Sequence, residues 1–90
     1  MKAPKGKTVR LLKTVRGQID GVLKMIEEDQ YCMDIVNQIL ASDAILRKTV
    51  REILHAHMSH CVSEAIETGD AAARDEKIDE MMSVLEKLSR

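Results

Sequence analysis

The chain has almost no aromatic residues and very few helix breakers. It contains one Tyr and neither Phe nor Trp, so Ile, Leu, Val, Met and Ala must build the core of its 90 residues. One Pro and four Gly are present, and none of them falls between Gly21 and Gly69. Globular helices typically run about 8–20 residues. The uninterrupted interval therefore predicts one unusually long helix.

Two further absences bear on location and chemistry. No segment approaches the roughly 18 apolar residues of a membrane span, and the basic N-terminus lacks the apolar core of a signal peptide. We therefore expect a cytoplasmic protein whose two cysteines stay reduced, and two are too few for a disulfide scaffold. A Gly-rich phosphate loop, GxSxG and HExxH are also missing, so we expect no enzyme activity.

The net charge of -1 hides an asymmetry along the chain. Six basic residues precede the first acidic residue, Asp20, whereas acidic residues outnumber basic ones beyond Cys61. A basic end on a nearly neutral protein can bind a polyanion such as nucleic acid. A solvated tail and helix face would carry the same charges, so charge alone leaves both interpretations open.

A first helix is expected from Thr8, as its cap, to about Glu28, after a flexible segment at residues 1–6. Gly17 and Gly21 lie one turn apart, and we interpret them as a notch that lets another helix approach closely. Apolar residues recur at spacings of three and four and form a stripe: Val9, Leu12, Val15, Ile19, Leu23 and Ile26.

A second helix is expected to begin between Tyr31 and Asp34 and to end at the stop signal of residues 68–70. A third should run from about Ala72 to Leu88. The predicted buried positions are Ile35, Ile39, Leu46, Val50, Ile53, Met58 and Val62 on the second helix, and Ile78, Met82, Val84, Leu85 and Leu88 on the third. The sequence therefore predicts a single all-α domain of residues 1–90, with three helices and one long central helix.

The two cysteines lie near opposite ends of the long helix. At a rise of about 1.5 Å per residue, Cys32 and Cys61 are separated by roughly 43 Å. They can therefore meet only if they belong to different subunits. If two such helices pack antiparallel about a two-fold axis near residues 46 and 47, Cys32 of one chain lies opposite Cys61 of the other.

Helical phase selects one of three histidines as a companion of Cys61. His57 precedes Cys61 by four residues and shares its face, whereas His55 and His60 point elsewhere. Two thiolates and one imidazole are soft to borderline ligands that favour Cu(I) or Zn(II). Structural zinc sites use four protein ligands, so three ligands favour Cu(I). A free Cys is often only a small buried hydrophobe, but the matched phase and register favour a ligand or redox role.

The strings RGQIDGVLKMIEEDQYCMDIVNQI and HAHMSHCVSEAIETGD resemble the copper-sensing repressors of the CsoR/RcnR family, over about residues 11–88. The resemblance implies a dimer that forms an antiparallel four-helix bundle, and a homotetramer built as a dimer of dimers. It also implies that the metal-free protein binds the operator DNA of copper-export genes and that Cu(I) releases it. Cys32, His57 and Cys61 match the family's copper ligands by position.

The resemblance also assigns residues around the metal and on the DNA-binding surface. Tyr31 and Glu80 match a tyrosine and a glutamate near the copper ligands, Glu80 after a short insertion following Gly69. Many members have arginine at the position of Thr14 and glutamate or glutamine at that of Arg16, so the basic pattern is shifted here. The DNA-binding candidates are Arg10, Lys13, Arg16, Arg47, Lys48 and Arg51.

Two other functions remain open at this point. Persulfide-sensing members of the family keep both cysteines and lack the histidine, so His57 favours copper. The same scaffold could instead join Cys32 to Cys61 of another subunit through a disulfide or polysulfide. A cytosolic copper buffer or helical interaction protein with no DNA role is the third hypothesis.

Overall fold

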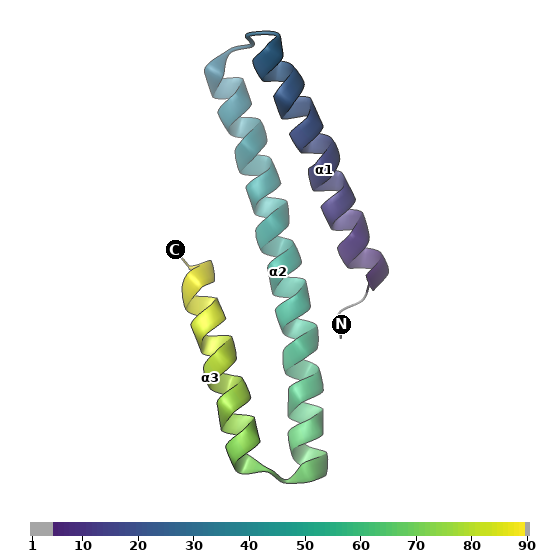
Figure 1. Cartoon of the computed structure of the whole chain (residues 1–90), viewed down its shortest axis with the longest axis vertical. Coiled ribbons are helices and arrows are strands. Elements are labelled where there is room, and N and C mark those ends of the chain that lie inside the picture. Colours follow the sequence, from purple (N-terminus) through teal and green to yellow (C-terminus); the bar gives the residue numbers. More distant parts are fainter. Residues whose placement is uncertain (1–4, 90) are drawn as a thin grey trace.

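The computed structural model describes residues 5–89, apart from the side chains of residues 62, 65 and 66. Three helices follow one another: α1 (Lys5–Glu27), α2 (Cys32–Thr68) and α3 (Ala71–Leu88). The described residues contain no strand. α1 and α2 form an antiparallel hairpin, and α3 folds back along the second half of α2 (Figure 1). The predicted all-α protomer with one long central helix is confirmed.

α1 begins earlier than its predicted cap. Lys5 and Gly6 belong to the predicted flexible segment but are helical, and Thr8 is only 5% exposed inside the helix. Thr8 shares a seven-residue spacing with Val15 and Val22, the buried apolar residues of α1. Thr8 is therefore placed by packing together with Val15 and Val22. The prediction that Thr8 caps the first helix is wrong. Residues 1–4 of the predicted flexible segment lie outside the described residues.

The seam between α1 and α2 has seven-residue periodicity on both helices. Val15 and Val22 of α1 and Ser42 and Thr49 of α2 are all buried. The Ser42 hydroxyl donates to Gln18 Oε1 at 2.8 Å, so the buried hydroxyl has a partner. Residues repeating every seven positions keep one side of each helix facing the other, as in coiled coils. Small and β-branched side chains thus line a narrow seam between the two helices.

The apolar stripes predicted as buried mostly face away from this seam. Of the apolar stripe predicted on α1, only Val15 is buried in the single chain. Two helices packed side by side each cover one face of the other, which leaves the second apolar face open. Exposed members of the predicted sets are Val9, Leu12, Ile19, Leu23, Ile26, Ile39, Leu46, Val50, Met58, Ile78, Met82 and Leu85, and Val62 lies outside the described side chains.

Two local details correct the predicted packing. A Cβ added at Gly17 or Gly21 would meet no atom within 4 Å, so these glycines do not admit a neighbouring helix within the protomer. On α3, Met81 is buried at 4% exposure, whereas Met82 is 60% exposed. Val84 and Leu88, three and seven residues after Met81, are half-buried. α3 therefore contacts α2 through a face centred on Met81.

The protomer exposes more surface than a compact chain of its size. Its accessible surface is 6747 Å², whereas a compact monomer of 10.1 kDa exposes roughly 5300 Å². Its extents of 58 × 27 × 12 Å and radius of gyration of 17.8 Å describe a flat rod. Within the described residues, no helix combines the length and apolar character required to cross a bilayer. The excess surface carries the open apolar stripes and favours association with another chain.

Candidate metal centre

His57 and Cys61 lie in contact on one face of α2. The distance from Cys61 Sγ to His57 Nε2 is 3.6 Å, and both residues are half-buried. His55 is exposed, and His60 points to Glu64, with 3.5 Å between Nε2 and Oε2. The structure thus brings together the same histidine and cysteine that the helical phase predicts.

Cys61 opens into a groove between the C-terminal end of α2 and α3. The groove has a volume of about 490 Å³. Met58 of α2 and Ile78, Met81 and Met82 of α3 supply its apolar wall. The basic residues Arg74 and Lys77 line it as well. Cys61 therefore borders a largely apolar recess that two basic residues also line, an environment that suits a soft ligand atom.

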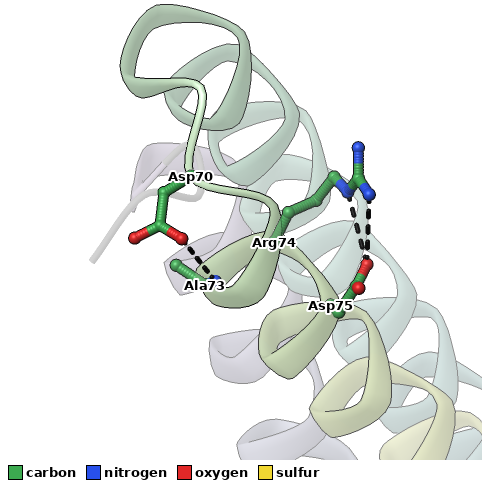
Figure 2. Close-up of polar contacts among 4 residues, drawn as sticks. All are labelled: Asp70, Ala73, Arg74 and Asp75. Carbon is green, nitrogen blue, oxygen red and sulfur yellow. Dashed lines mark hydrogen bonds and ion pairs between the residues drawn. The ribbon is translucent and has the colours of Figure 1, made fainter.

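The turn between α2 and α3 lines one end of this groove. Gly69 has φ +68°, a left-handed conformation that glycine adopts without the steric cost of a Cβ. Asp70 then caps α3 by accepting a hydrogen bond from Ala73 N at 3.1 Å (Figure 2). Arg74 donates to Asp75 from Nε and Nη2 at 3.3 Å each (Figure 2). The chain therefore reverses at the predicted stop signal and lays α3 against α2.

Cys32 lies at the opposite end of the same helix. It is exposed at the first residue of α2, and both cysteines are free. The unbroken helix keeps its Cα roughly 43 Å from that of Cys61. No group of three or more His, Cys, Asp or Glu side chains that could hold a metal occurs among the described residues. Within one chain only His57 and Cys61 of the three candidate ligands lie together, so Cys32 could join such a pair only from another chain.

The predicted companions of the ligands are also split between the two ends. Tyr31 is 68% exposed and directly precedes Cys32. Glu80 lies on α3, where its Oε2 is 3.8 Å from Lys77 Nζ. Lys77 and Met81 were not among the predicted site residues, although both line the groove. The spacing of four residues from Lys77 to Met81 and of seven from Met81 to Leu88 is the signal that could have revealed this face of α3.

The candidate DNA-binding residues lie at similar positions along the length of the α1–α2 hairpin. Lys7 Nζ pairs with Glu52 Oε1 at 2.9 Å, and this contact together with the Gln18–Ser42 bond sets the antiparallel register. Residues 10–13 of α1 consequently lie level with residues 47–50 of α2. Five candidates are exposed there: Arg10, Lys13, Arg16, Lys48 and Arg51. The sixth, Arg47, is half-buried.

The register contact also shifts the acidity of Glu52. The hydrogen bond from Lys7 lowers the pKa of Glu52, and the nearby positive charges of Lys7, Lys48 and His55 act in the same direction. Desolvation opposes this lowering. Glu52 therefore remains ionised beside the basic cluster and fixes Lys7 in place.

Comparison with known proteins identifies the family. Residues 4–87 match the family described as metal-sensitive transcriptional repressors. The chain belongs to this family. Repressors of this family are not enzymes, so the membership confirms both the predicted resemblance and the expected lack of enzyme activity.

Curated relatives in this repressor family are copper sensors. The chain is 40% identical to the copper-sensing transcriptional repressor RicR of Mycobacterium tuberculosis, over 88% of this chain and 81% of RicR. It is 37% identical to the copper-sensing transcriptional repressor CsoR of Bacillus subtilis, over 88% of this chain and 75% of CsoR.

Two solved structures of transcriptional regulators share the fold. The Cu(I) complex of the copper-sensing repressor CsoR from Geobacillus thermodenitrificans superposes with a TM-score of 0.81 at 35% identity, covering 94% of this chain and 85% of CsoR. The nickel-responsive regulator InrS also gives 0.81, at 26% identity, covering 98% and 96%. Because proteins of this fold respond to different metals, the fold alone does not identify the metal.

Proposed function

We propose that the chain is a Cu(I)-responsive transcriptional repressor, which binds operator DNA without metal and is released by Cu(I). The observation that carries this proposal is the contact between His57 and Cys61, with Cys32 at the far end of the same rigid helix. The copper-sensing relatives at 37–41% identity support the choice of metal.

The donor set fits Cu(I) when two chains combine. Cys32 of one subunit joins the partner's His57 and the partner's Cys61, which gives two thiolates and one imidazole. This soft set of three suits Cu(I) better than a four-ligand structural zinc site. Bound Cu(I) would be held by Cys32 of one subunit with the partner's His57 and the partner's Cys61, and it would supply a soft Lewis acid beside the largely apolar groove at Cys61.

The open apolar stripes provide the surface for assembly. The accessible surface of each chain exceeds that of a compact monomer by roughly 1400 Å². Specific interfaces bury about 800 Å² per partner. One contact of standard size does not account for all of it. We propose an antiparallel four-helix dimer formed by α1 and α2, and a homotetramer of two such dimers.

The basic residues of the α1–α2 hairpin form the proposed DNA-binding surface: Arg10, Lys13, Arg16, Arg47, Lys48 and Arg51. These residues do not predict which bases are recognised, because Lys and Arg on a helix surface first neutralise phosphates, and phosphate contacts carry no sequence information. Neutralising several of them should weaken binding to all sequences and flatten its salt dependence. A repressor acts on the chromosome, so we place the protein in the bacterial cytoplasm.

Metal and DNA are coupled negatively in this proposal. Closing the inter-subunit site involves Tyr31 beside Cys32 and Glu80 on α3, and it biases the assembly towards a shape that fits DNA poorly. Coupling between two binding sites is reciprocal, so operator DNA must weaken Cu(I) binding by the factor by which Cu(I) weakens DNA binding.

An anaerobic Cu(I) titration tests the proposal. An operator duplex is first selected from a random DNA pool with the metal-free protein, and its binding is followed by fluorescence anisotropy. We expect Cu(I) to lower the affinity, whereas Ni(II) and Zn(II) at the same concentration should have little effect. An operator affinity that Cu(I) leaves unchanged rejects the proposal, and release by Ni(II) alone reassigns the metal.

A thiol-based response is the second candidate, because Cys32 is an exposed free thiol. In this case Cys32 joins the partner's Cys61 through a disulfide or polysulfide, with an added persulfide or oxidant accepting the electrons. His57→Ala separates the two functions. The substitution should abolish the copper response but leave an inter-subunit cross-link detectable by mass spectrometry after persulfide treatment.

A further inference from the structure

Arg47 differs from the other cations of the proposed DNA surface because it is already engaged. Its Nε donates to Asp43 Oδ2 at 3.1 Å, and its Nη1 donates to the main-chain carbonyl of Leu88. The neighbouring Lys48 and Arg51 are exposed, and in the described part of the chain they make no side-chain hydrogen bond or ion pair. Arg47 therefore connects the middle of α2 to the last turn of α3.

The same face of α2 carries Arg47 at one end and Cys61 at the other. Arg47, Leu54 and Cys61 recur every seven residues and are all half-buried. α3 runs antiparallel beside the second half of α2 (Figure 1). Its first turns wall the groove at Cys61, and its last turn accepts the hydrogen bond from Arg47. Movement of α3 therefore affects both Arg47 and Cys61.

The contacts to Asp43 and Leu88 limit what else Arg47 can bind. A guanidinium grips a phosphate with two parallel N–H bonds along one edge. One such edge uses Nε and the other uses Nη1, and both of these nitrogens already donate. The C-terminal carbonyls of a helix carry partial negative charge, so they attract the guanidinium as a phosphate does. A docked α3 thus competes with DNA for Arg47.

We propose that Arg47 is a latch with two alternative acceptors, the C-terminal carbonyl of α3 and a DNA phosphate. When α3 is docked, the guanidinium is held by Leu88 and Asp43. When α3 is released, Arg47 joins Lys48 and Arg51 on the DNA. This inference rests on the proposed function, and it supplies a route from the groove to the operator. A ligand that holds α3 closed over Cys61 removes one cation from the DNA surface.

Hydrogen exchange of the free protein tests the first acceptor without metal or DNA. We compare Arg47→Gln with Arg51→Gln, which removes the same charge four residues further along α2. Peptides from residues 81–88 should exchange roughly two- to fivefold faster in Arg47→Gln and at the wild-type rate in Arg51→Gln. Peptides from α1 should be unchanged in both. Wild-type exchange of α3 in Arg47→Gln overturns the latch.

Operator binding tests the second acceptor. Each phosphate contact contributes about 0.9 to the slope of log affinity against log salt, so both substitutions should flatten the metal-free slope by about that amount. Only Arg47→Gln should shrink the ratio of metal-free to Cu(I)-loaded affinity. If Arg47→Gln leaves the salt slope unchanged, or leaves the ratio of metal-free to Cu(I)-loaded affinity unchanged, Arg47 does not exchange between the two acceptors and the proposal is overturned. If Cu(I) fails to release the wild-type protein, the proposed function fails, while the exchange rates and the metal-free slope still decide the two acceptors of Arg47.

Discussion

Mixing a Cys32→Ser protein with a Cys61→Ser protein should restore copper binding that neither variant has alone. Each variant by itself lacks one thiolate in every site. In a two-fold dimer with one chain of each kind, one site lacks both thiolates and the other keeps all three ligands. Random pairing makes about half of the dimers mixed, so about a quarter of the wild-type sites should return.

The geometry of α2 makes this outcome specific to a shared site. Cys32 and Cys61 are roughly 43 Å apart along one unbroken helix. Two thiolates bound to one metal at about 2.3 Å each lie only about 4 Å apart. A site inside one chain would require α2 to break and fold back, and mixing two defective chains would then restore nothing.

The assay requires exchanged subunits and a stringent copper competitor. The two variants are unfolded together, refolded under anaerobic reducing conditions, and titrated with Cu(I) against a chromophoric Cu(I) chelator. Each variant taken alone through the same steps provides the background, and native mass spectrometry counts the mixed dimers. If mixed dimers are present but bind no more copper than the average of the separate samples, the inter-subunit site is refuted.

Three further predictions follow from individual side chains. His57→Ala should lower Cu(I) affinity at least about tenfold, as measured by chelator competition, because one of three ligands is lost. Met81→Ala should lower the free energy of unfolding in urea by about 2–5 kcal/mol, since Met81 is the buried anchor of α3. The same change at the exposed Met82 should stay within about 0.5 kcal/mol. The hydrogen bond from Lys7 depresses the folded-state pKa of Glu52, so its contribution to stability is present above pH 4.5 and lost as the pH falls through the lower folded value. Glu52→Gln should therefore flatten the acid limb of a thermal-stability profile, and an unchanged limb would contradict this origin.

The helices and the contact between His57 and Cys61 could be predicted from the sequence because their determinants are local. The absence of Pro and Gly predicted the length of α2, and Gly69 marked its end through a conformation that suits glycine. The four-residue spacing of His57 and Cys61 brought their side chains together. Each of these results depends on residues within one or two helical turns.

The packing partner of each apolar stripe could not be predicted in the same way. α1 carries two adjacent lines, and the more apolar one, which includes Leu12 and Ile19, remains exposed while Thr8 and Val15 face α2. Periodicity shows that a face is suited to burial, but it does not say which chain covers it. An oligomer can bury its strongest stripe between subunits and leave a weaker seam inside the protomer.

The role of Arg47 was hidden for a different reason. Its acceptor is a main-chain carbonyl at Leu88, and every residue type has such a carbonyl. Only the docking of α3 brings that atom to α2, so no pattern of charges in the sequence reveals the contact. The cation was therefore assigned to DNA together with Lys48 and Arg51.

In the proposed assembly, the unbroken length of α2 sets the distance and the rotation between Cys32 and Cys61. Inserting one residue near its midpoint would lengthen the helix by about 1.5 Å and rotate one end by about 100° relative to the other. Cys32 would then turn away from its counterpart even though every ligand is still encoded. The proposed site therefore tolerates insertions or deletions in α2 only in steps that preserve both spacing and phase.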